Sequence, residues 1–218
     1  MASRRVRANP GQGARLREEI LDAAEQLLES SGSEDALTVR AVAAAAGVST
    51  PSVYLHFADR EALLEAVCIR VWDELEDLFH RCQVTDPFHS LGRFGRAYVK
   101  FALAHPVQYR VLLMRRSSSE NRAATTCFRL ITDAIATCVA TGSMQGDPGT
   151  LALQLWSAAH GCVSLLITQP HLPWPEDLDA FIDDTIRMAG FGVALQARLP
   201  QVRTSPELTT ALEGVHAP

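Results

Sequence analysis

At 218 residues, the chain is long enough for one large domain or for a small domain joined to a larger one. Hydrophobic residues make up 47% of it, which excludes global disorder and allows a packed core. The formal net charge of -5 does not by itself favour a nucleic-acid ligand. Basic residues nevertheless cluster before the first acidic residue, Glu18, at Arg4, Arg5, Arg7, Arg15 and Arg17. A basic arm beside an acidic body is typical of a protein that contacts phosphate at one end, although a merely solvated N-terminus would carry the same cluster.

The cysteines and the apolar runs indicate the compartment. The five cysteines are odd in number and contain no CxxC pair, which suits neither a disulfide framework nor a zinc ribbon. We find no uninterrupted apolar run of roughly 18 residues, as a membrane span needs, and no basic-then-apolar leader. We therefore expect a cytoplasmic protein with reduced thiols, no bound metal and no membrane association.

Apolar residues recur at three- and four-residue spacing, and we find no convincing alternating strand pattern, so we predict an all-α fold. The first helix is expected over 14–31, ending at Gly32. Thr38 is a good N-cap for a short helix that ends at Gly47, and Ser49 is a good N-cap for a very short helix over 50–57. Pro51 lies in the first turn of that helix, where its missing N–H costs nothing.

A longer helix begins behind Asp59 and is expected to run to about residue 80, with a continuous apolar stripe. Further helices are predicted at about 89–104, 106–115, 119–141, 147–168 and 176–199. The breaks between them are Pro106, the serine run at 117–119, the segment 142–149 and the PHLPWP segment at 170–175. After Pro200 the tail shows little periodicity, and we expect it to be loosely ordered.

Residues 38–64, TVRAVAAAAGVSTPSVYLHFADREALL, carry the most informative pattern. A short helix, a glycine turn and a second short helix predict a helix-turn-helix, whose second helix enters the DNA major groove. Gly47 can take the left-handed conformation that ends the first of these helices. The small residues Val42, Ala43 and Ala46 allow the pair to pack closely against the preceding helix.

Polar side chains gather where such a reader helix meets DNA. The serines and threonine of its N-terminal turn can reach base edges, and Pro51 can contact a thymine methyl. Tyr54 and His56 offer donors to phosphate oxygens, and the two arginines of the segment supply charge. Any one of these could be an ordinary surface residue, and Tyr54 could be half-buried packing. The predicted DNA site comprises Thr38, Arg40, Ser49, Thr50, Pro51, Ser52, Tyr54, His56 and Arg60.

This segment closely resembles the N-terminal domain of the tetracycline-repressor (TetR) family. The family pattern is a threonine-led helix, an A-G-V-S turn, a Y-x-H-F core, a lysine and E-x-L-L. The matching residues here are Thr38, Ala46, Gly47, Val48, Ser49, Tyr54, His56, Phe57, Glu61, Leu63 and Leu64, with Arg60 in the place of the lysine. The resemblance is strong over about 14–67 and otherwise rests on helix count and length. It implies about nine helices, three of them for DNA and the fourth linking them to a ligand and dimer domain.

The resemblance divides the chain into a basic arm (1–13), a helix-turn-helix DNA-binding domain (14–58), a linking helix (59–80), a ligand-binding and dimerisation domain (81–199) and a loosely ordered tail (200–218). The larger domain has no glycine-rich phosphate loop, no H-E-x-x-H and no G-x-S-x-G. Its histidines lack metal-ligand spacing. We therefore expect no enzymatic activity, no cofactor and no metal.

Aromatic residues on the later helices suggest a sensing pocket. Trp156 and His160 are four residues apart, so they share a helix face. The W-x-x-x-H-G run ending at Gly161 resembles the WHG subgroup of TetR-type C-terminal domains, and HPVQYRVLL at 105–113 resembles the family's sixth helix. An aromatic stripe is also common in a plain core, and this alternative stays open. The predicted pocket residues are Phe94, Tyr98, Phe101, Tyr109, Met114, Phe128, Trp156 and His160.

The last two predicted helices before the tail offer an apolar surface for a homodimer. The residues expected there are Leu151, Leu155, Ala158, Ala159, Cys162, Phe181, Ile182, Ile186 and 188–191. We interpret the chain as a repressor that binds a near-palindromic double-stranded operator as a dimer. A small apolar or amphipathic effector would bind among helices four to eight and release it. The alternatives are a DNA-binding activator or repressor without an effector and, less well supported, a helical enzyme.

Overall fold

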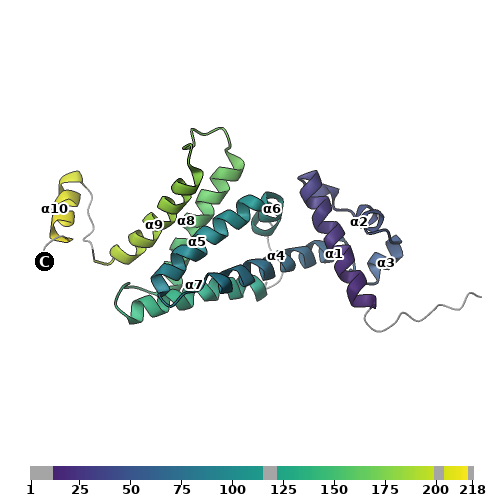
Figure 1. Ribbon diagram of the computed structural model, residues 1–218, viewed down its shortest axis with the longest axis horizontal. Helices are drawn as coiled ribbons and strands as arrows, with labels where there is room; N and C mark the ends of the chain where they lie inside the picture. Colours follow the sequence, from purple (N-terminus) through teal and green to yellow (C-terminus); the bar gives the residue numbers. More distant parts are fainter. Residues whose placement is uncertain (1–11, 115–121, 199–203, 216–218) are drawn as a thin grey trace, which may run out of the picture. The chain divides into compact units, whose positions relative to one another are not determined.

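The computed structural model describes residues 12–114, 122–198 and 204–215, and all regular structure within these ranges is helical, as predicted (Figure 1). The arm arginines Arg4, Arg5 and Arg7 fall outside these ranges. The elements are α1 (Gln12–Ser31), the 3₁₀ turn η1 (Glu34–Ala36), α2 (Val39–Ala45), α3 (Thr50–Tyr54), α4 (Arg60–Cys82), α5 (Pro87–Ala104), α6 (Pro106–Met114), α7 (Arg122–Ala140), α8 (Pro148–Thr168), α9 (Leu178–Leu195) and α10 (Ser205–Val215).

The chain forms two compact units. Unit 1 contains α1 to α3, the part of α4 up to Glu74, and α6. Unit 2 contains the end of α4 from Leu75, together with α5 and α7 to α10. Helix α6 therefore groups with the helix-turn-helix, whereas the sequence placed it in the ligand-binding part of the chain.

The core of unit 1 forms because the apolar stripes of its short helices face one another. Ile20, Leu21 and Leu28 of α1 are fully buried against Val42 of α2 and Val53 of α3. The small side chains of α2 let these helices approach closely. In Figure 1, α2 and α3 lie against one side of α1.

Local capping sets the bounds of α2 and α3. The Thr38 hydroxyl accepts a hydrogen bond from the Ala41 N–H at 3.1 Å, and the Ser49 hydroxyl accepts one from the Ser52 N–H at 3.3 Å. Gly47 has a φ of 67°, and its N–H and the Val48 N–H bond back to carbonyls of α2, which is the Schellman arrangement. Both predicted N-caps and the glycine turn are confirmed. Helix α3 ends at Tyr54, three residues earlier than predicted.

In unit 2, the helices α5, α7, α8 and α9 pack against one another around one core. Helix α8 contacts the other three and lies beside α9 (Figure 1). By length and composition it is the one helix of the described residues that is apolar enough to cross a membrane. It contacts three neighbouring helices, and 28% of that apolar window is buried within the protomer.

Two expectations for this unit were wrong. Residues 205–215 of the tail form a helix, α10, although its sequence showed little periodicity. Several side chains predicted for a dimer surface are instead buried within the protomer, namely Leu151, Ala159, Cys162, Ile182 and Ile186. The large exposed apolar residues of α8 and α9 are Leu153, Leu165, Leu178, Met188 and Phe191. Helical periodicity identified apolar faces but did not say which of them the protomer covers itself.

Helices α5 and α9 meet at Gly95. A Cβ atom there would lie 2.8 Å from Cγ2 of Ile186, which is closer than carbon atoms tolerate. At Gly92, one turn earlier, a Cβ atom would meet nothing within 4 Å. The two glycines share a helix and differ in packing alone.

We expect overpacking in Gly95→Ala to lower the free energy of unfolding by about 1–3 kcal/mol. The higher helix propensity of alanine should offset less than about 1 kcal/mol of this loss. Gly92→Ala should raise it by about 0.5–1 kcal/mol. Urea unfolding at matched protein concentration measures both. In an Ile186→Ala background the penalty at Gly95 should vanish, and its persistence there would contradict this packing account.

Candidate functional site

The predicted reader helix α3 presents a compact exposed surface. Pro51 and Tyr54 are exposed, the latter by 53%, while Val53 points into the core. Thr50, Ser52 and His56 are half-buried. Leu55, which sequence reasoning passed over, is 83% exposed beside Tyr54. An apolar side chain at this place can contact a sugar or a thymine methyl.

The two serines at the start of α3 are partly used by the fold itself. Their hydroxyl oxygens lie 2.7 Å apart, and Ser49 also caps the helix. One hydroxyl hydrogen bond within the pair leaves further acceptor and donor capacity for a ligand. Ser49 therefore has a structural role in addition to its predicted role in DNA contact, and Thr38 likewise caps α2.

Arg60, predicted to contact phosphate, is held by the protein. Its Nε donates to the Leu37 carbonyl at 2.8 Å, and Nη2 donates to the Glu34 carbonyl at 2.6 Å. Its Nη1 pairs with the Glu61 carboxylate at 2.9 Å. The guanidinium thus fastens the η1–α2 connection to the first turn of α4. A guanidinium has five N–H donors, so two are left for a phosphate oxygen.

Arg40 lies exposed on α2, and Arg17 of α1 stacks its guanidinium over Phe57, 5.1 Å from the ring centroid. The exposed side chain of Arg40 suits a contact with a guanine edge or a phosphate. Arg17 links α1 to Phe57, three residues beyond the end of the reader helix, at a distance typical of a cation–π contact. Arg17 therefore contributes to the fold of unit 1 as well as to its charge.

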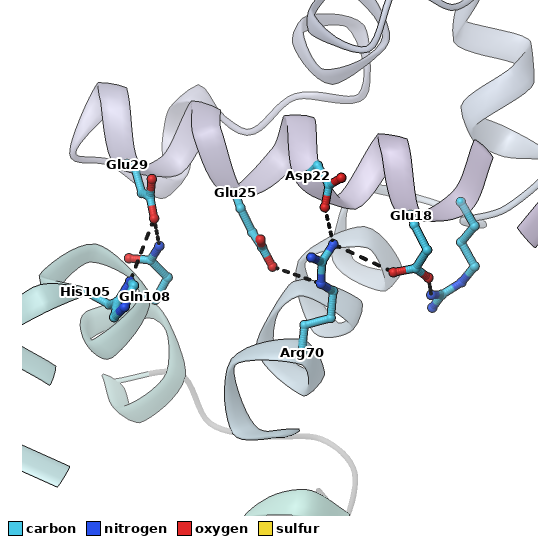
Figure 2. A network of polar contacts seen from close by, with 8 residues as sticks. Glu18, Asp22, Glu25, Glu29, Arg70, His105 and Gln108 are labelled. Atoms are coloured by element: carbon cyan, nitrogen blue, oxygen red, sulfur yellow. Dashed lines mark hydrogen bonds and ion pairs between the residues drawn. The ribbon is translucent and has the colours of Figure 1, made fainter. Parts of the chain in front are cut away.

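An acidic face of α1 is held to α4 by a single arginine (Figure 2). The Arg70 guanidinium lies 2.8 Å from Asp22, 3.3 Å from Glu25 and 3.8 Å from Glu18. Burial acts to lower the pKa of Arg70, but the hydrogen bond that it donates to Asp22 and the nearby acidic charges raise the pKa overall. Burial raises the pKa of Glu25, and Arg70 offsets only part of that rise.

Further along α1, Glu29 makes polar contacts with α6 (Figure 2). The Gln108 amide donates to its carboxylate at 2.8 Å, and His105 Nδ1 lies 3.8 Å away. Arg110 donates to the Gly32 carbonyl at 2.9 Å, just beyond the end of α1. These polar contacts explain why α6 belongs to unit 1.

A pocket of about 470 Å³ lies within unit 2, which is within the usual range for small-molecule sites. Its apolar wall includes Phe79, Phe94, Tyr98, Trp156, Ile186 and Phe191. Phe79 stacks on Phe94 with ring centroids 5.0 Å apart, and Tyr98 lies 5.0 Å from Trp156. The helices that line it are the end of α4, α5, α7, α8 and α9.

Three of the eight predicted pocket residues, Phe94, Tyr98 and Trp156, line this cavity. Two others contact that wall. Phe128 meets Trp156 edge to face, and His160 Nδ1 lies 3.2 Å from the Tyr98 hydroxyl. Burial lowers the pKa of His160, which favours a neutral imidazole that can accept the tyrosine O–H. Trp156 and His160 therefore lie close together, as their spacing predicted.

The remaining three predicted pocket residues do not line the cavity. Phe101 is half-buried on α5 outside it, and Tyr109 is buried in unit 1 because α6 packs there. The side chain of Met114 lies outside the described part of the chain. Sequence reasoning also missed the charged lining, which includes Arg93, Arg96, Asp183 and Arg187. A signal was available, since residues 89, 92, 93 and 96 fall on one face of α5 at helical spacing.

Comparison with known proteins identifies this arrangement. Residues 20–67 match the model of the bacterial regulatory proteins of the tetR family, and residues 91–189 match that of the tetracyclin repressor-like C-terminal domain. The two matches cover the helix-turn-helix and most of the pocket-bearing unit. The chain belongs to the TetR family. It is therefore a helix-turn-helix, DNA-binding regulator of transcription.

Individual relatives agree with this TetR-family assignment. An uncharacterized HTH-type transcriptional regulator of Mycobacterium tuberculosis is 28% identical over 79% of each chain. The class D tetracycline repressor protein of Escherichia coli is 31% identical over 47% of this chain and 42% of its own. A solved structure of a protein with unknown function from Rhodococcus sp. RHA1 superposes with a TM-score of 0.71 at 25% identity, covering 87% of this chain and 98% of that one.

The anchoring of Arg60 predicts a loss of stability when it is removed from this TetR-family protein. Arg60→Ala should lower the free energy of unfolding by about 1–3 kcal/mol, because two backbone carbonyls lose a charged donor. Arg60→Lys keeps the charge but can satisfy only part of this geometry, so an intermediate loss is expected. Thermal unfolding of both variants measures the effect. Unchanged stability of Arg60→Ala would show that these bonds are not maintained in solution.

The raised pKa of Glu25 predicts a pH-dependent effect. The pKa of this carboxyl is higher in the folded state than in the unfolded state. Its favourable contribution to the free energy of unfolding is therefore fully present below the pKa of the unfolded state, and it is lost as the pH rises through the pKa of the folded state. At neutral pH, Glu25→Gln should therefore raise the free energy of unfolding, since the amide avoids the cost of a partly buried charge. The gain should shrink in acid. Asp22→Gln, which removes the closest carboxylate, should be destabilising at neutral pH.

Proposed function

We propose that this protein is a homodimeric repressor that leaves its operator when a small molecule fills the pocket of unit 2. The DNA-binding half of the proposal is supported by the capped helix-turn-helix with Pro51, Tyr54 and Leu55 exposed on or beside its reader helix. The observation that carries the ligand half is the pocket itself. Its volume of about 470 Å³ and its mostly apolar, aromatic wall are typical of a small-molecule site.

Exposed apolar residues support the dimer. Leu153 and Leu165 of α8 and Met188 and Phe191 of α9 are 48% to 69% exposed. Since α8 and α9 lie side by side, the two helices can offer one apolar surface to a second copy. Two-fold pairing would give two reader helices for a near-palindromic site.

Helix α4 supports a link between the two activities. Its first residue, Arg60, follows the reader helix closely in sequence, and Phe79, in its last turn, lines the pocket. A ligand can release DNA only if it binds two states of the protein unequally. A change at the pocket end of one continuous helix can meet that requirement.

The second candidate is a DNA-binding regulator without an effector, whose pocket has no ligand. An activator would carry the same DNA-binding site. We propose no enzymatic activity, and we place the protein in the cytoplasm with DNA. Within the described ranges, no group of three or more His, Cys, Asp or Glu is arranged to hold a metal ion. The assignment to the WHG subgroup stays a prediction from the W-x-x-x-H-G run.

Binding of the full chain to the DNA upstream of its own gene, with salt varied and competitor DNA present, tests the proposal. We expect competitor-resistant binding of two chains per site. Tyr54→Phe should weaken it about tenfold or more if the hydroxyl donates to a phosphate. Arg40→Gln should weaken it and flatten its dependence on salt by about one unit of slope if the contact is to phosphate.

Arg129→Gln provides the matched control, because it removes the same charge from an exposed position on α7 in the other unit. It should bind like the unaltered protein. Weak binding that vanishes uniformly with salt, and that Tyr54→Phe leaves unchanged, would refute the predicted reader contacts.

A further inference from the structure

The pocket of unit 2 has a charged side as well as an apolar wall. Three arginines line it, Arg93 and Arg96 from α5 and Arg187 from α9. Two aspartates of α9, Asp183 and Asp184, line it as well. At neutral pH these three guanidinium groups face two carboxylates. The lining therefore carries one positive charge in excess.

Ion pairs show which arginine carries that excess. Arg96 hydrogen-bonds to Asp183 across the α5–α9 contact. Arg187 pairs with Asp184 at 2.7 Å within α9. The Nε of Arg93 donates instead to the backbone carbonyl of Cys82 at 2.8 Å, and a carbonyl carries no net charge. Among the described residues, no carboxylate lies within ion-pair distance of Arg93.

The position of Arg93 suits an anionic ligand. Its side chain is half-buried, so an anion there is partly shielded from water and its hydrogen bonds strengthen accordingly. With Nε used, four N–H donors of the fork are left for a carboxylate, sulfonate or phosphate group. At Arg96 and Arg187 an aspartate already balances the guanidinium charge, which makes those positions less favourable for a ligand anion.

The rest of the lining calls for an apolar body on the same molecule. Phe79, Phe94 and Trp156 supply aromatic surface, and Gly92, next to Arg93, leaves open space beside the α5 backbone. We propose that the pocket binds an amphipathic organic anion, with Arg93 holding its charged group and the aromatic wall its apolar part. This rests on the proposed function and names the chemical class of the effector.

Two fluorescent probes that differ in one group test this proposal. 8-Anilinonaphthalene-1-sulfonate is an amphipathic anion, and N-phenyl-1-naphthylamine is the same molecule without the sulfonate. Titration of the full chain should show the anion binding about 10- to 100-fold more tightly, as expected for a charge-assisted hydrogen bond. Equal affinities for the two probes would overturn the proposal, and this comparison needs no variant.

Variants locate the binding. Arg93→Gln should weaken the sulfonate probe by the same factor and leave the neutral probe unchanged, whereas Arg93→Lys should restore part of the preference. Arg129→Gln, which removes an exposed arginine outside the pocket, should change neither. Gly92→Leu, whose side chain enters open pocket space, should weaken both. Equal weakening of both probes by Arg93→Gln would show a structural role and contradict the assignment.

Failure of this ligand proposal can be distinguished from failure of the proposed DNA-binding function. Operator binding by the unliganded chain does not depend on either probe. Unchanged binding of the sulfonate probe to Gly92→Leu would place the probe elsewhere and overturn the assignment to this pocket, while competitor-resistant DNA binding would still support the regulator.

Discussion

Helix α4 must bury side chains in two separate cores, and much of the structure follows from that constraint. Its N-terminal part contributes Leu63, Leu64 and Val67 to the core of the DNA-binding unit. Its last two turns contribute Leu75 and Phe79 to the other unit, where Phe79 stacks on Phe94. The backbone hydrogen bonds of a continuous helix fix the angle between successive turns, so the places of these two apolar faces on α4 follow from its sequence.

Polar bonds fix α4 at three points along its length. Arg60 holds its first turn to the η1–α2 connection, Arg70 holds its middle to α1, and Arg93 donates to the carbonyl of its last residue, Cys82. Two of these donors reach backbone carbonyls, which need partners wherever water is excluded. Arginine suits all three positions, because one planar group can serve several acceptors at once.

The features that the sequence predicted well are local ones. The caps at Thr38 and Ser49 and the turn at Gly47 depend on residues within a few positions of each other, so their chemistry can be read directly from the chain. Arg60 shows the limit of this reasoning. Its partners Leu37 and Glu34 lie 23 and 26 residues away, and nothing in the residue itself distinguishes a bond to those carbonyls from a bond to phosphate.

The pocket was predictable only in part, for the same reason. The i, i+4 spacing of Trp156 and His160 correctly placed them together, and Tyr98 joins them. Tyr109 looked equivalent, since it is aromatic and lies on a neighbouring helix, but the polar contacts of α6 with Glu29 and Gly32 assign that helix to the other unit. The Arg96–Asp183 pair depends on how α5 and α9 pack, which depends in turn on the absence of a side chain at Gly95.

The same guanidinium that lines the pocket also holds the end of α4, and this gives the proposed regulation a physical basis. A ligand must prefer one state of the protein to shift its population. An anion bound by the remaining donors of Arg93 shares the charge of a guanidinium whose Nε bonds to the Cys82 carbonyl. Its binding free energy therefore depends on how closely that carbonyl approaches Arg93. A displacement of the α4 terminus that changes this distance would change the affinity of the pocket for the anion. By reciprocity, the bound anion would favour one position of the helix.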